Sequence, residues 1–289
     1  MTQLPRRTLL TALAATAVLP RPALAQAQPR AGQGLLKKLQ AAKKVRVGIA
    51  NQPPFSSLNP DGSVTGAAPA ISKAVLARLG IVEMEGFIAS YGELIPGMMA
   101  DRWDFVSASL TITKARCAQV LYADPLILDG SALFYKKTPG GPTPQSVADV
   151  VKLDAPLGIQ AGGADLRTVI ADGVARNNIV QFTSDQEIID GLLANRMPYA
   201  LTAYSALRHV LEGRDTTDLA IVYPVVDDPP KGSSCAFRMA DTDLYDAYQT
   251  ELRALKASGE FAAILKQYGY DTSPALLTIT ADQACATAI

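Results

Sequence analysis

The segment Ser107–Arg116, SASLTITKAR, brings hydroxyl groups and a permanent cation to the end of an apolar pattern. Small and apolar residues alternate in its first half, which predicts a buried strand. Thr111 and Thr113 follow at the carboxyl end, where open α/β sheets bind their ligands. Arg116 then lies on a loop, and its planar donor fork matches a carboxylate. The pattern predicts a site for a small carboxylate-bearing ligand, unless the arginine is solvated or pairs with a nearby acid such as Asp124.

The elements around this segment follow a strand–helix–strand order. Helical spacing of apolar residues ends at Gly80, and a Pro-Asp-Gly turn lies upstream. The expected strands are residues 45–50, 85–89 and 105–109, and the expected helices are residues 68–79 and 94–100. This order predicts a parallel, doubly wound α/β sheet.

A second α/β unit follows a Gly- and Pro-rich break at residues 138–142. The expected helices are residues 146–151, 165–176, 185–195 and 204–211, and the expected strands are residues 157–160, 179–182 and 199–202. Two amphipathic helices, residues 243–258 and 260–268, come last.

Two α/β units with a late return segment predict a two-lobed α/β fold, in which two doubly wound sheets are joined by a two-strand hinge. The chain would cross between the lobes at residues 127–132 and 223–228. We assign residues 44–129 to the first part of lobe 1, 130–224 to lobe 2, and 225–289 to the return to lobe 1 and the C-terminal helices. Lobes connected in this way can close on a ligand.

The first 25 residues have the pattern of an export signal. Arg6 and Arg7 precede an apolar run, and Ala23-Leu24-Ala25 is a small-residue cleavage site. The run is shorter than a typical membrane-spanning helix. We predict cleavage after Ala25 and a soluble, monomeric protein in the periplasm. The arginine pair is typical of twin-arginine signals and also occurs in ordinary secretory signals, so both export routes stay open.

The composition allows a large core but gives no excess of charge. Hydrophobic residues make up 48% of the 289 residues and charged residues 19%. Loss of Arg6, Arg7 and Arg21 lowers the count of Lys and Arg from 27 to 24 against 27 Asp and Glu, a net charge of −3. This balance does not favour a nucleic-acid or membrane-surface partner. The sequence shows no nucleophile with a base, no metal-ligand cluster and no phosphate loop, so we expect no catalytic residue, metal or cofactor.

Three cysteines, Cys117, Cys235 and Cys285, lack the spacing of a metal site. Two of them can pair in an oxidising compartment. We predict a Cys117–Cys285 disulfide, which would tie the C-terminal tail to the first lobe. Three free thiols are the alternative, and the mass of the unreduced protein distinguishes the two.

Several segments accompany Ser107–Arg116 in a fixed order. They read VRVGIANQPPF, DGSVTGAAPAISKAV and SYGELIPGMMADRWDFVSASL upstream, and QVLYADPLI downstream. Together they resemble the periplasmic solute-binding proteins of family 3, which serve polar amino-acid ABC transporters, and within it the branch that binds ectoine and hydroxyectoine. The resemblance runs from about residue 45 to the C-terminus. It implies two lobes that close on a small ligand and pass it to an ABC permease in the inner membrane.

The resemblance also implies roles for individual residues. Arg116 would hold the ligand carboxylate, and Thr111 would hydrogen-bond the same end. From the opposite lobe, the N–H groups of Gly162, Gly163 and Ala164 at the start of a helix would bind that carboxylate. Without the family context, these glycines would be read as a plain turn.

Aromatic rings are expected at the cationic end of the ligand. Phe55 and Tyr91 match positions where family members stack rings on the ligand, and ordinary core packing is the alternative reading. Tyr204 of the second lobe is a further candidate ring, and Thr202 is a further candidate lining residue.

Three positions decide which ligand the resemblance favours. Ala203 falls where many amino-acid binders have an aspartate for the ligand's ammonium group. A primary ammonium buried there without a partner would be costly, so a delocalised or alkylated cation is favoured. Gln52 and Thr111 depart from the ectoine branch, which has a glutamate and an aromatic residue at these places. Another zwitterion, such as a different compatible solute or a modified amino acid, therefore remains an alternative ligand.

The leading hypothesis is a receptor for a small zwitterion, either ectoine, hydroxyectoine or a related compatible solute. The alternatives are a binder of a polar amino acid or derivative, a periplasmic dehydratase of the same fold, and a sensory receptor that docks on a membrane signalling partner. A dehydratase needs a positioned acid or base, and Gln52, Thr111 and Ala203 provide none.

Overall fold

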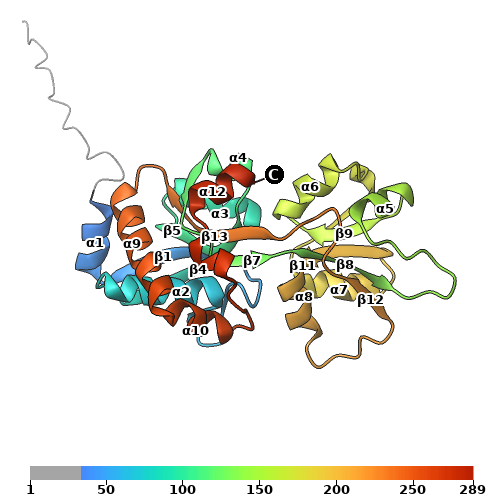
Figure 1. Ribbon diagram of the computed structural model, residues 1–289, viewed down its shortest axis with the longest axis horizontal. Helices are drawn as coiled ribbons and strands as arrows, with labels where there is room; N and C mark the ends of the chain where they lie inside the picture. Colours follow the sequence, from blue (N-terminus) through green and yellow to red (C-terminus); the bar gives the residue numbers. More distant parts are fainter. Residues whose placement is uncertain (1–33, 289) are drawn as a thin grey trace, which may run out of the picture. The chain divides into compact units, whose positions relative to one another are not determined.

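The computed structural model describes residues 34–288. The expected export signal and its cleavage site lie outside the described residues. Two sheets organise the described chain (Figure 1). We call the part built on the six-stranded sheet lobe 1 and the part built on the five-stranded sheet lobe 2.

The sheet of lobe 1 has the strand order β4-β1-β5-β13-β6, and β7 also pairs with β13. Its strands are β1 (Lys44–Ile49), β4 (Glu83–Ile88), β5 (Phe105–Thr111), β6 (Val120–Tyr122), β7 (Ile127–Asp129) and β13 (Lys231–Arg238). β1 is parallel to β4 and β5, as the sequence predicts. β13 is antiparallel to β5 because it enters lobe 1 from the other lobe, so this sheet is mixed rather than wholly parallel.

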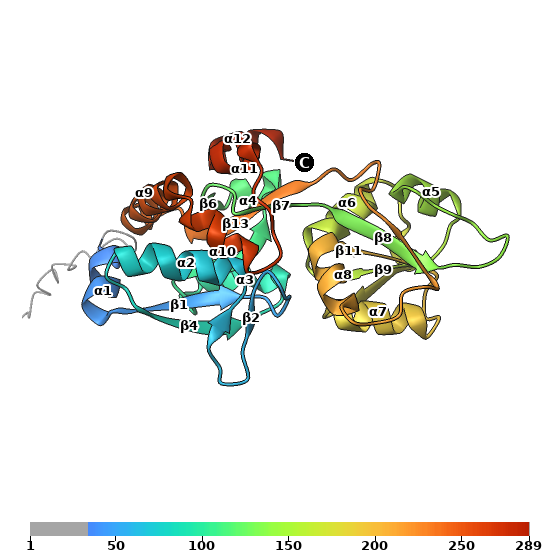
Figure 2. The same cartoon turned by 60° about the horizontal axis from the view of Figure 1, so that its bottom comes forward.

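Helices cover both faces of this sheet (Figure 2). They are α1 (Leu35–Ala42), α2 (Ala67–Arg78), α3 (Tyr91–Met99), α9 (Thr242–Ser258) and α10 (Glu260–Lys266). A hairpin of β2 (Ser57–Leu58) and β3 (Val64–Thr65) surrounds the expected Pro-Asp-Gly turn. Stacked Phe105 and Phe237, with Tyr248 against both, are fully buried at the centre of the lobe.

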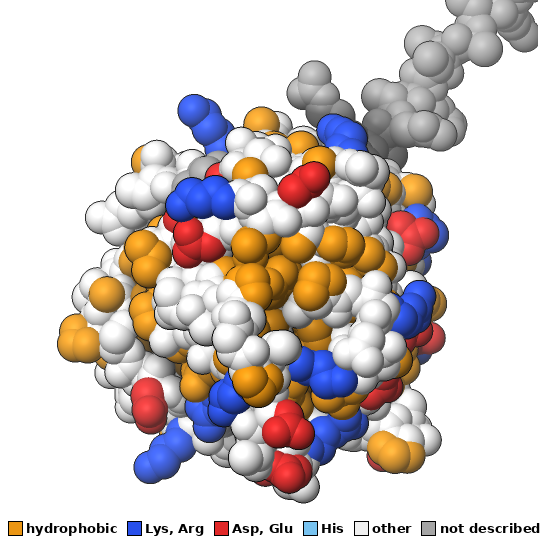
Figure 3. Space-filling view, turned by 90° about the vertical axis from the view of Figure 1, so that its right-hand side faces the viewer, with side chains coloured by type: hydrophobic (Ala, Val, Ile, Leu, Met, Phe, Trp, Pro, Cys, Tyr) orange, Lys and Arg blue, Asp and Glu red, His pale blue; other side chains and the backbone are white. Residues whose placement is uncertain are grey.

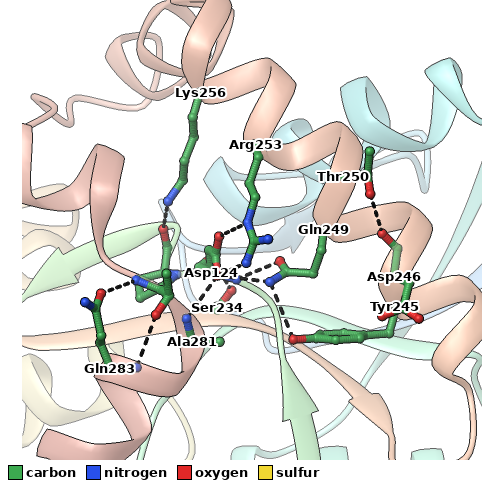
Figure 4. Close-up of polar contacts among 12 residues, drawn as sticks. Asp124, Ser234, Tyr245, Asp246, Gln249, Thr250, Arg253, Lys256, Ala281 and Gln283 are labelled. Atoms are coloured by element: carbon green, nitrogen blue, oxygen red, sulfur yellow. Dashed lines mark hydrogen bonds and ion pairs between the residues drawn. The ribbon is translucent and has the colours of Figure 1, made fainter.

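A buried carboxylate, Asp124, fastens the C-terminal segment to lobe 1 (Figure 4). Its Oδ1 accepts hydrogen bonds from Gln249 Nε2 at 2.9 Å and from the Ala281 N–H at 3.0 Å. Its Oδ2 accepts from Arg253 Nε at 2.8 Å. Asp124 thus pairs with Arg253 and not with Arg116, which removes one alternative for the latter.

The last helices, α11 (Pro274–Thr278) and α12 (Ala281–Thr287), pack on lobe 1. A disulfide joins Cys285 of α12 to Cys117 of α4 (Lys114–Cys117), the pair expected from the sequence. Cys235 is a free, buried thiol. Because Cys117 directly follows Arg116, the disulfide also anchors the short helix that carries the arginine.

The sheet of lobe 2 has the strand order β10-β9-β11-β8-β12. Its strands are β8 (Ser131–Lys136), β9 (Leu157–Gln160), β10 (Ile179–Phe182), β11 (Tyr199–Ala203) and β12 (Leu219–Val222). Its helices are α5 (Val147–Lys152), α6 (Ala164–Ala171), α7 (Asp185–Leu193) and α8 (Tyr204–Leu211), with a short 3-10 turn at Arg176–Asn178. β9 is parallel to β10 and β11, whereas β8 is antiparallel to β11 and β12.

The chain passes between the two sheets twice. β7 pairs within lobe 1 and β8 within lobe 2, so the first crossing lies at Gly130. β12 belongs to lobe 2 and β13 to lobe 1, so the second crossing lies within residues 223–230. β7 and β13 are antiparallel neighbours, with Lys231 opposite Asp129. The crossings therefore place charged residues side by side at the junction of the lobes.

Lobe 2 exposes several large hydrophobic side chains, at Leu153, Leu193, Ile221, Tyr223 and Val226. On the face shown in Figure 3, hydrophobic side chains gather at the centre and charged ones surround them. Among residues 34–288, no helix has both the length and the apolar character that crossing a membrane requires.

Candidate functional site

A cleft lies where the two lobes and the crossing strands meet. We define it by its lining residues, which from lobe 1 are Gln52, Phe55, Tyr91, Ser109, Thr111 and Ser233. Lobe 2 contributes Gln160, Gly163, Ala164, Asp165, Thr202 and Ala203. The crossings contribute Asp129, Gly130, Ser131 and Lys231. The space between these residues amounts to about 650 Å³ and is continuous with solvent at its mouth.

The two expected rings of lobe 1 both line the cleft. Phe55 follows a Pro-Pro pair and is 5% exposed, with its ring 6.0 Å from that of Tyr270. Tyr91 begins α3 and directs its hydroxyl to Gln52 Oε1 at 2.7 Å. Burial raises the pKa of Tyr91, so the phenol stays a neutral donor. Phe55 therefore packs in the core of lobe 1 and also lines the cleft. Tyr91 presents its ring to the cleft, because its hydroxyl is already hydrogen-bonded to Gln52.

Gln52 is committed to protein contacts. Its Nε2 donates to Asp185 Oδ2 at 2.9 Å and to Gln160 Oε1 at 3.0 Å, both on lobe 2. Its Oε1 accepts from Tyr91. All three carboxamide contacts are thus made within the protein, and Gln52 joins the two lobes while it also lines the cleft.

Asp185, at the start of α7, is a buried carboxylate that sequence reasoning did not single out. Its Oδ1 accepts a hydrogen bond from the Thr202 hydroxyl and its Oδ2 from Gln52. Burial raises the pKa of Asp185, and this effect is larger than the lowering by the two hydrogen bonds. Thr202 lines the cleft as expected, but its hydroxyl proton is directed to Asp185.

Arg116 lies beside the cleft, not on its wall. It sits on helix α4, where the sequence predicted a loop, because the Thr113 hydroxyl accepts from the Arg116 N–H and caps the helix. Its Nη1 donates to the Thr111 carbonyl at 3.0 Å and its Nη2 to the Gly162 carbonyl at 3.4 Å. Arg116 lines an adjoining hollow that shares Tyr91, Gly163 and Ala164 with the cleft.

The helix start predicted to bind a carboxylate is present in lobe 2. Gly163 is the N-cap of α6 and offers no side chain to its first N–H groups. Gly163 and Ala164 line both the cleft and the adjoining hollow, whereas Gly162 lines only the hollow. Gly162 has a φ of +70°, and a Cβ there would lie 2.6 Å from the Gly92 backbone nitrogen of lobe 1. The backbones of the two lobes therefore approach each other closely at this pair of glycines.

Tyr204 does not line the cleft, contrary to the expectation of a third ring. It stacks on Tyr223, with ring centroids 3.8 Å apart and planes 7° from parallel. Arg208, one helical turn further along α8, lies over the same ring. These contacts hold the ring on α8, and the cleft wall at this point is Ala203.

Sequence reasoning also missed the charged and hydroxyl groups at the crossings. Asp129, Asp165 and Lys231 all line the cleft. Ser109 and Ser233 line it as well, and their buried hydroxyls have no hydrogen-bond partner in the structure. A detectable signal was the group of polar residues in KGSS at the start of β13, but the pairing of this strand with β7 was needed to place them at the cleft.

The chain matches a family model over residues 45–271. It belongs to the bacterial extracellular solute-binding proteins, family 3. The matched segment of this family 3 protein contains the strands of both lobes. It also contains all cleft-lining residues and Arg116.

Named relatives and solved structures agree with this family 3 assignment. A probable amino-acid ABC transporter periplasmic-binding protein of Sinorhizobium fredii is 28% identical over 246 residues, covering 83% of this chain and 81% of the relative. The L-arginine-binding protein of Pseudomonas aeruginosa is 28% identical over 242 residues, covering 81% and 90%. The crystal structure of EhuB in complex with hydroxyectoine has a TM-score of 0.83 at 32% identity, covering 88% of this chain and 98% of that chain.

Proposed function

We propose that this protein is the extracytoplasmic receptor of an ABC importer and binds a small zwitterion of the ectoine or hydroxyectoine type between its lobes. The observation that carries this proposal is a cleft with two rings, Phe55 and Tyr91, beside the unpartnered hydroxyls of Ser109 and Ser233. The likeness to EhuB, solved with hydroxyectoine, supports the ligand type. The likeness to an amino-acid ABC transporter periplasmic-binding protein supports the transport role.

Arg116 and the start of α6 are the proposed partners of the ligand carboxylate. The guanidinium has five N–H groups, and the structure engages one on Thr111 and one on Gly162. Arg116 lines the hollow that shares Gly163 and Ala164 with the cleft, and three of its donors are not engaged by these two carbonyls. A carboxylate at this shared boundary would accept charge-assisted hydrogen bonds, each contributing about 1.5–3 kcal/mol.

The rings would hold the positive end. Cation–π contact with desolvated rings contributes about 0.5–2 kcal/mol for each ring. The ligand would therefore contact lobe 1 through Phe55 and Tyr91 and lobe 2 through the start of α6, which favours the closed arrangement. We propose binding without turnover, as a monomer that delivers its ligand to a permease after export and cleavage at Ala25.

Titration calorimetry on the exported protein tests this function. Ectoine or hydroxyectoine is expected to bind with micromolar affinity or better, about −8 kcal/mol. Arg116→Ala should lose most of this affinity, and Arg176→Ala, an exposed arginine remote from the cleft, should keep it. Wild-type affinity in Arg116→Ala would refute the carboxylate role.

A polar or cationic amino acid is the second candidate ligand. Asp129 and Asp165 line the cleft and could receive an ammonium group despite the alanine at position 203. The 28% identity with an L-arginine-binding protein points the same way. A thermal-shift screen with both ligand classes separates the candidates, because a ligand that binds the native state raises its melting temperature.

A further inference from the structure

The two crossing strands place a row of polar side chains on the floor of the cleft. Lys231 of β13 lies opposite Asp129 of β7, and Ser233, two residues along β13, lies opposite Thr111 of β5. Residues two apart on a strand share a face, and directly opposed residues have neighbouring side chains. All four line the cleft, so this row faces the position of a ligand.

Asp165 faces this row from lobe 2. It lies in the first turn of α6, with its Oδ1 3.7 Å from Lys231 Nζ. Lys231 is also in direct contact with the buried Asp228, which does not line the cleft. One ammonium is therefore shared between Asp165 and Asp228, and no cationic side chain among residues 34–288 contacts Asp129. Among the described residues, the floor of the cleft thus has more negative than positive charge.

Asp129 is held in place but not neutralised. Its Oδ1 accepts from the Gly130 N–H at 2.9 Å and its Oδ2 from the Ser205 N–H at 3.2 Å. Each oxygen has a second acceptor position. Two carboxylates that face one small cleft repel each other, so a cation between them is favoured.

Two hydroxyls provide an independent indication that a ligand binds here. Ser109 is 4% exposed and Ser233 is 6% exposed, and the Oγ of each has no hydrogen-bond partner in the part of the chain that the structure describes. Buried polar groups in native proteins are nearly always hydrogen-bonded, and a missing partner calls for an explanation. Both residues line the same cleft as the two carboxylates, so a bound polar group would satisfy them.

We propose that Asp129 and Asp165 form the subsite for the positive end of the ligand, and that this end must present N–H groups. The inference rests on the proposed function and narrows its ligand class to zwitterions with a protonated amine, amidinium or guanidinium. A carboxylate only accepts hydrogen bonds, and a quaternary ammonium offers methyl groups and no donor. Filling the cleft with methyl groups would leave both carboxylates desolvated without partners, which is costly. Betaines are therefore excluded, although they carry the same net charge.

Calorimetry on the wild-type exported protein provides the first test. Ectoine, hydroxyectoine, L-arginine, L-glutamine and L-proline form the N–H panel, and glycine betaine and proline betaine form the quaternary panel. Proline and proline betaine differ only by two N-methyl groups in place of two N–H protons. The best N–H ligand is expected to bind at least a hundredfold more tightly than either betaine. A betaine within tenfold of that ligand would overturn the subsite while leaving a zwitterion receptor intact. Binding of neither panel would overturn the proposed function and the subsite together.

Variants provide the second test with the best N–H ligand. Asp165→Asn and Asp129→Asn should each raise its Kd at least tenfold. Asp190→Asn, which removes an exposed carboxylate of α7 outside the cleft, should change it less than twofold. Circular dichroism and melting temperature establish that each variant is folded. If one of the two cleft variants fails to fold, the other variant and the wild-type ligand panels still test the proposal. Unchanged affinity in a folded cleft variant would contradict the proposal.

Discussion

The side chain of Gln52 in lobe 1 donates a hydrogen bond to the carboxylate of Asp185 in lobe 2, with 2.9 Å between Nε2 and Oδ2. Both residues are 4% exposed, so water has little access to this contact. Protein groups on both lobes thus contribute to holding the lobes together. A second contact between the lobes joins Arg116 to the Gly162 carbonyl. Contacts within the protein therefore favour closure in addition to any contacts with the ligand.

Gln52→Ala is expected to favour the open arrangement. The change leaves Asp185 with Thr202 as its remaining side-chain partner and removes a hydrogen bond to a charged group, which contributes about 1.5–3 kcal/mol. The apparent Kd for the ligand should rise at least tenfold, and small-angle scattering should show a larger radius of gyration without ligand. Gln145→Ala, an exposed glutamine, is the matched control. Identical scattering and affinity in Gln52→Ala would show that this contact does not affect closure.

Gly162→Ala should separate the lobes by steric contact. The new Cβ would lie 2.6 Å from the Gly92 nitrogen, and residue 162 already has a positive φ. Gly213→Ala is the matched control, since Gly213 has a φ of +74° and open space around its Cβ position. Both variants incur the same kind of backbone strain, but only Gly162→Ala should weaken ligand binding. Equal affinity of the Gly162→Ala and Gly213→Ala variants would show that the close approach of Gly162 to Gly92 is not part of the ligand-bound arrangement.

Ligand affinity should fall in mild acid if Asp129 receives the cation. Burial raises the pKa of Asp129 to about 6, and Asp165 of α6 adds to this rise. Lys231 of β13, Tyr223 and Tyr270 are the other titratable groups around it. Because this pKa is raised on folding, protonated Asp129 stabilises the ligand-free protein below about pH 4. That stability is lost as the pH rises through about 6.

Binding has the opposite sign, because a cation favours the ionised carboxylate. Affinity should be greatest above pH 6 and about tenfold lower at pH 5 than at pH 7.5, the loss expected one unit below a pKa of about 6. Calorimetry between pH 5 and 7.5 in matched buffers measures this change in affinity. Asp129→Asn should bind more weakly, and its affinity should fall less than that of the wild type between pH 7.5 and 5. A wild-type profile that is already flat would argue against an ionised Asp129 in the complex.

Asp124→Asn should destabilise the protein without altering the cleft. Burial raises the pKa of Asp124, but hydrogen bonds from Arg253, Ala281 and Gln249 outweigh it and lower the pKa below its usual value. Loss of the charged acceptor should lower the free energy of unfolding by about 1.5–3 kcal/mol. Asp246→Asn, an exposed position on the same helix as Arg253 (Figure 4), is the control.

The pH dependence of this difference has a defined sign. A lowered pKa gives stability that is present above the unfolded pKa of about 4 and is lost as the pH falls through the folded pKa. The melting temperatures of wild type and Asp124→Asn should therefore converge in acid. A gap that widens on acidification would contradict the ionised state assigned to Asp124.

Removing the disulfide should affect both stability and affinity. Cys117→Ser with Cys285→Ser is expected to lower the free energy of unfolding by about 2–4 kcal/mol. Because Cys117 follows Arg116, the Kd should also rise as helix α4 loses its anchor on α12. Reduced wild-type protein should reproduce both effects. Three free thiols in the unreduced wild type would remove the basis of the prediction.

Local patterns were sufficient to place many elements and part of the cleft. Apolar spacing located α2, alternation located β5, and the glycine pair located the start of α6. Helix and strand formation at these places depends on residues within a few positions of each other. The resemblance to a known family directed attention to Phe55 and Tyr91, and the structure brings both to the cleft.

Tertiary structure alone decided how the polar groups are shared. Arg116 turned beside the cleft because carbonyl groups of Thr111 and Gly162 accept its protons, the latter 46 residues away. Gln52 hydrogen-bonds to Asp185, 133 residues away, and Asp129 lies opposite Lys231 only because the two strands pair. A sequence determines which hydrogen-bonding groups a chain carries. Which of them remain free for a ligand depends on contacts between distant segments, because each donor is engaged by the acceptor that folding brings within reach.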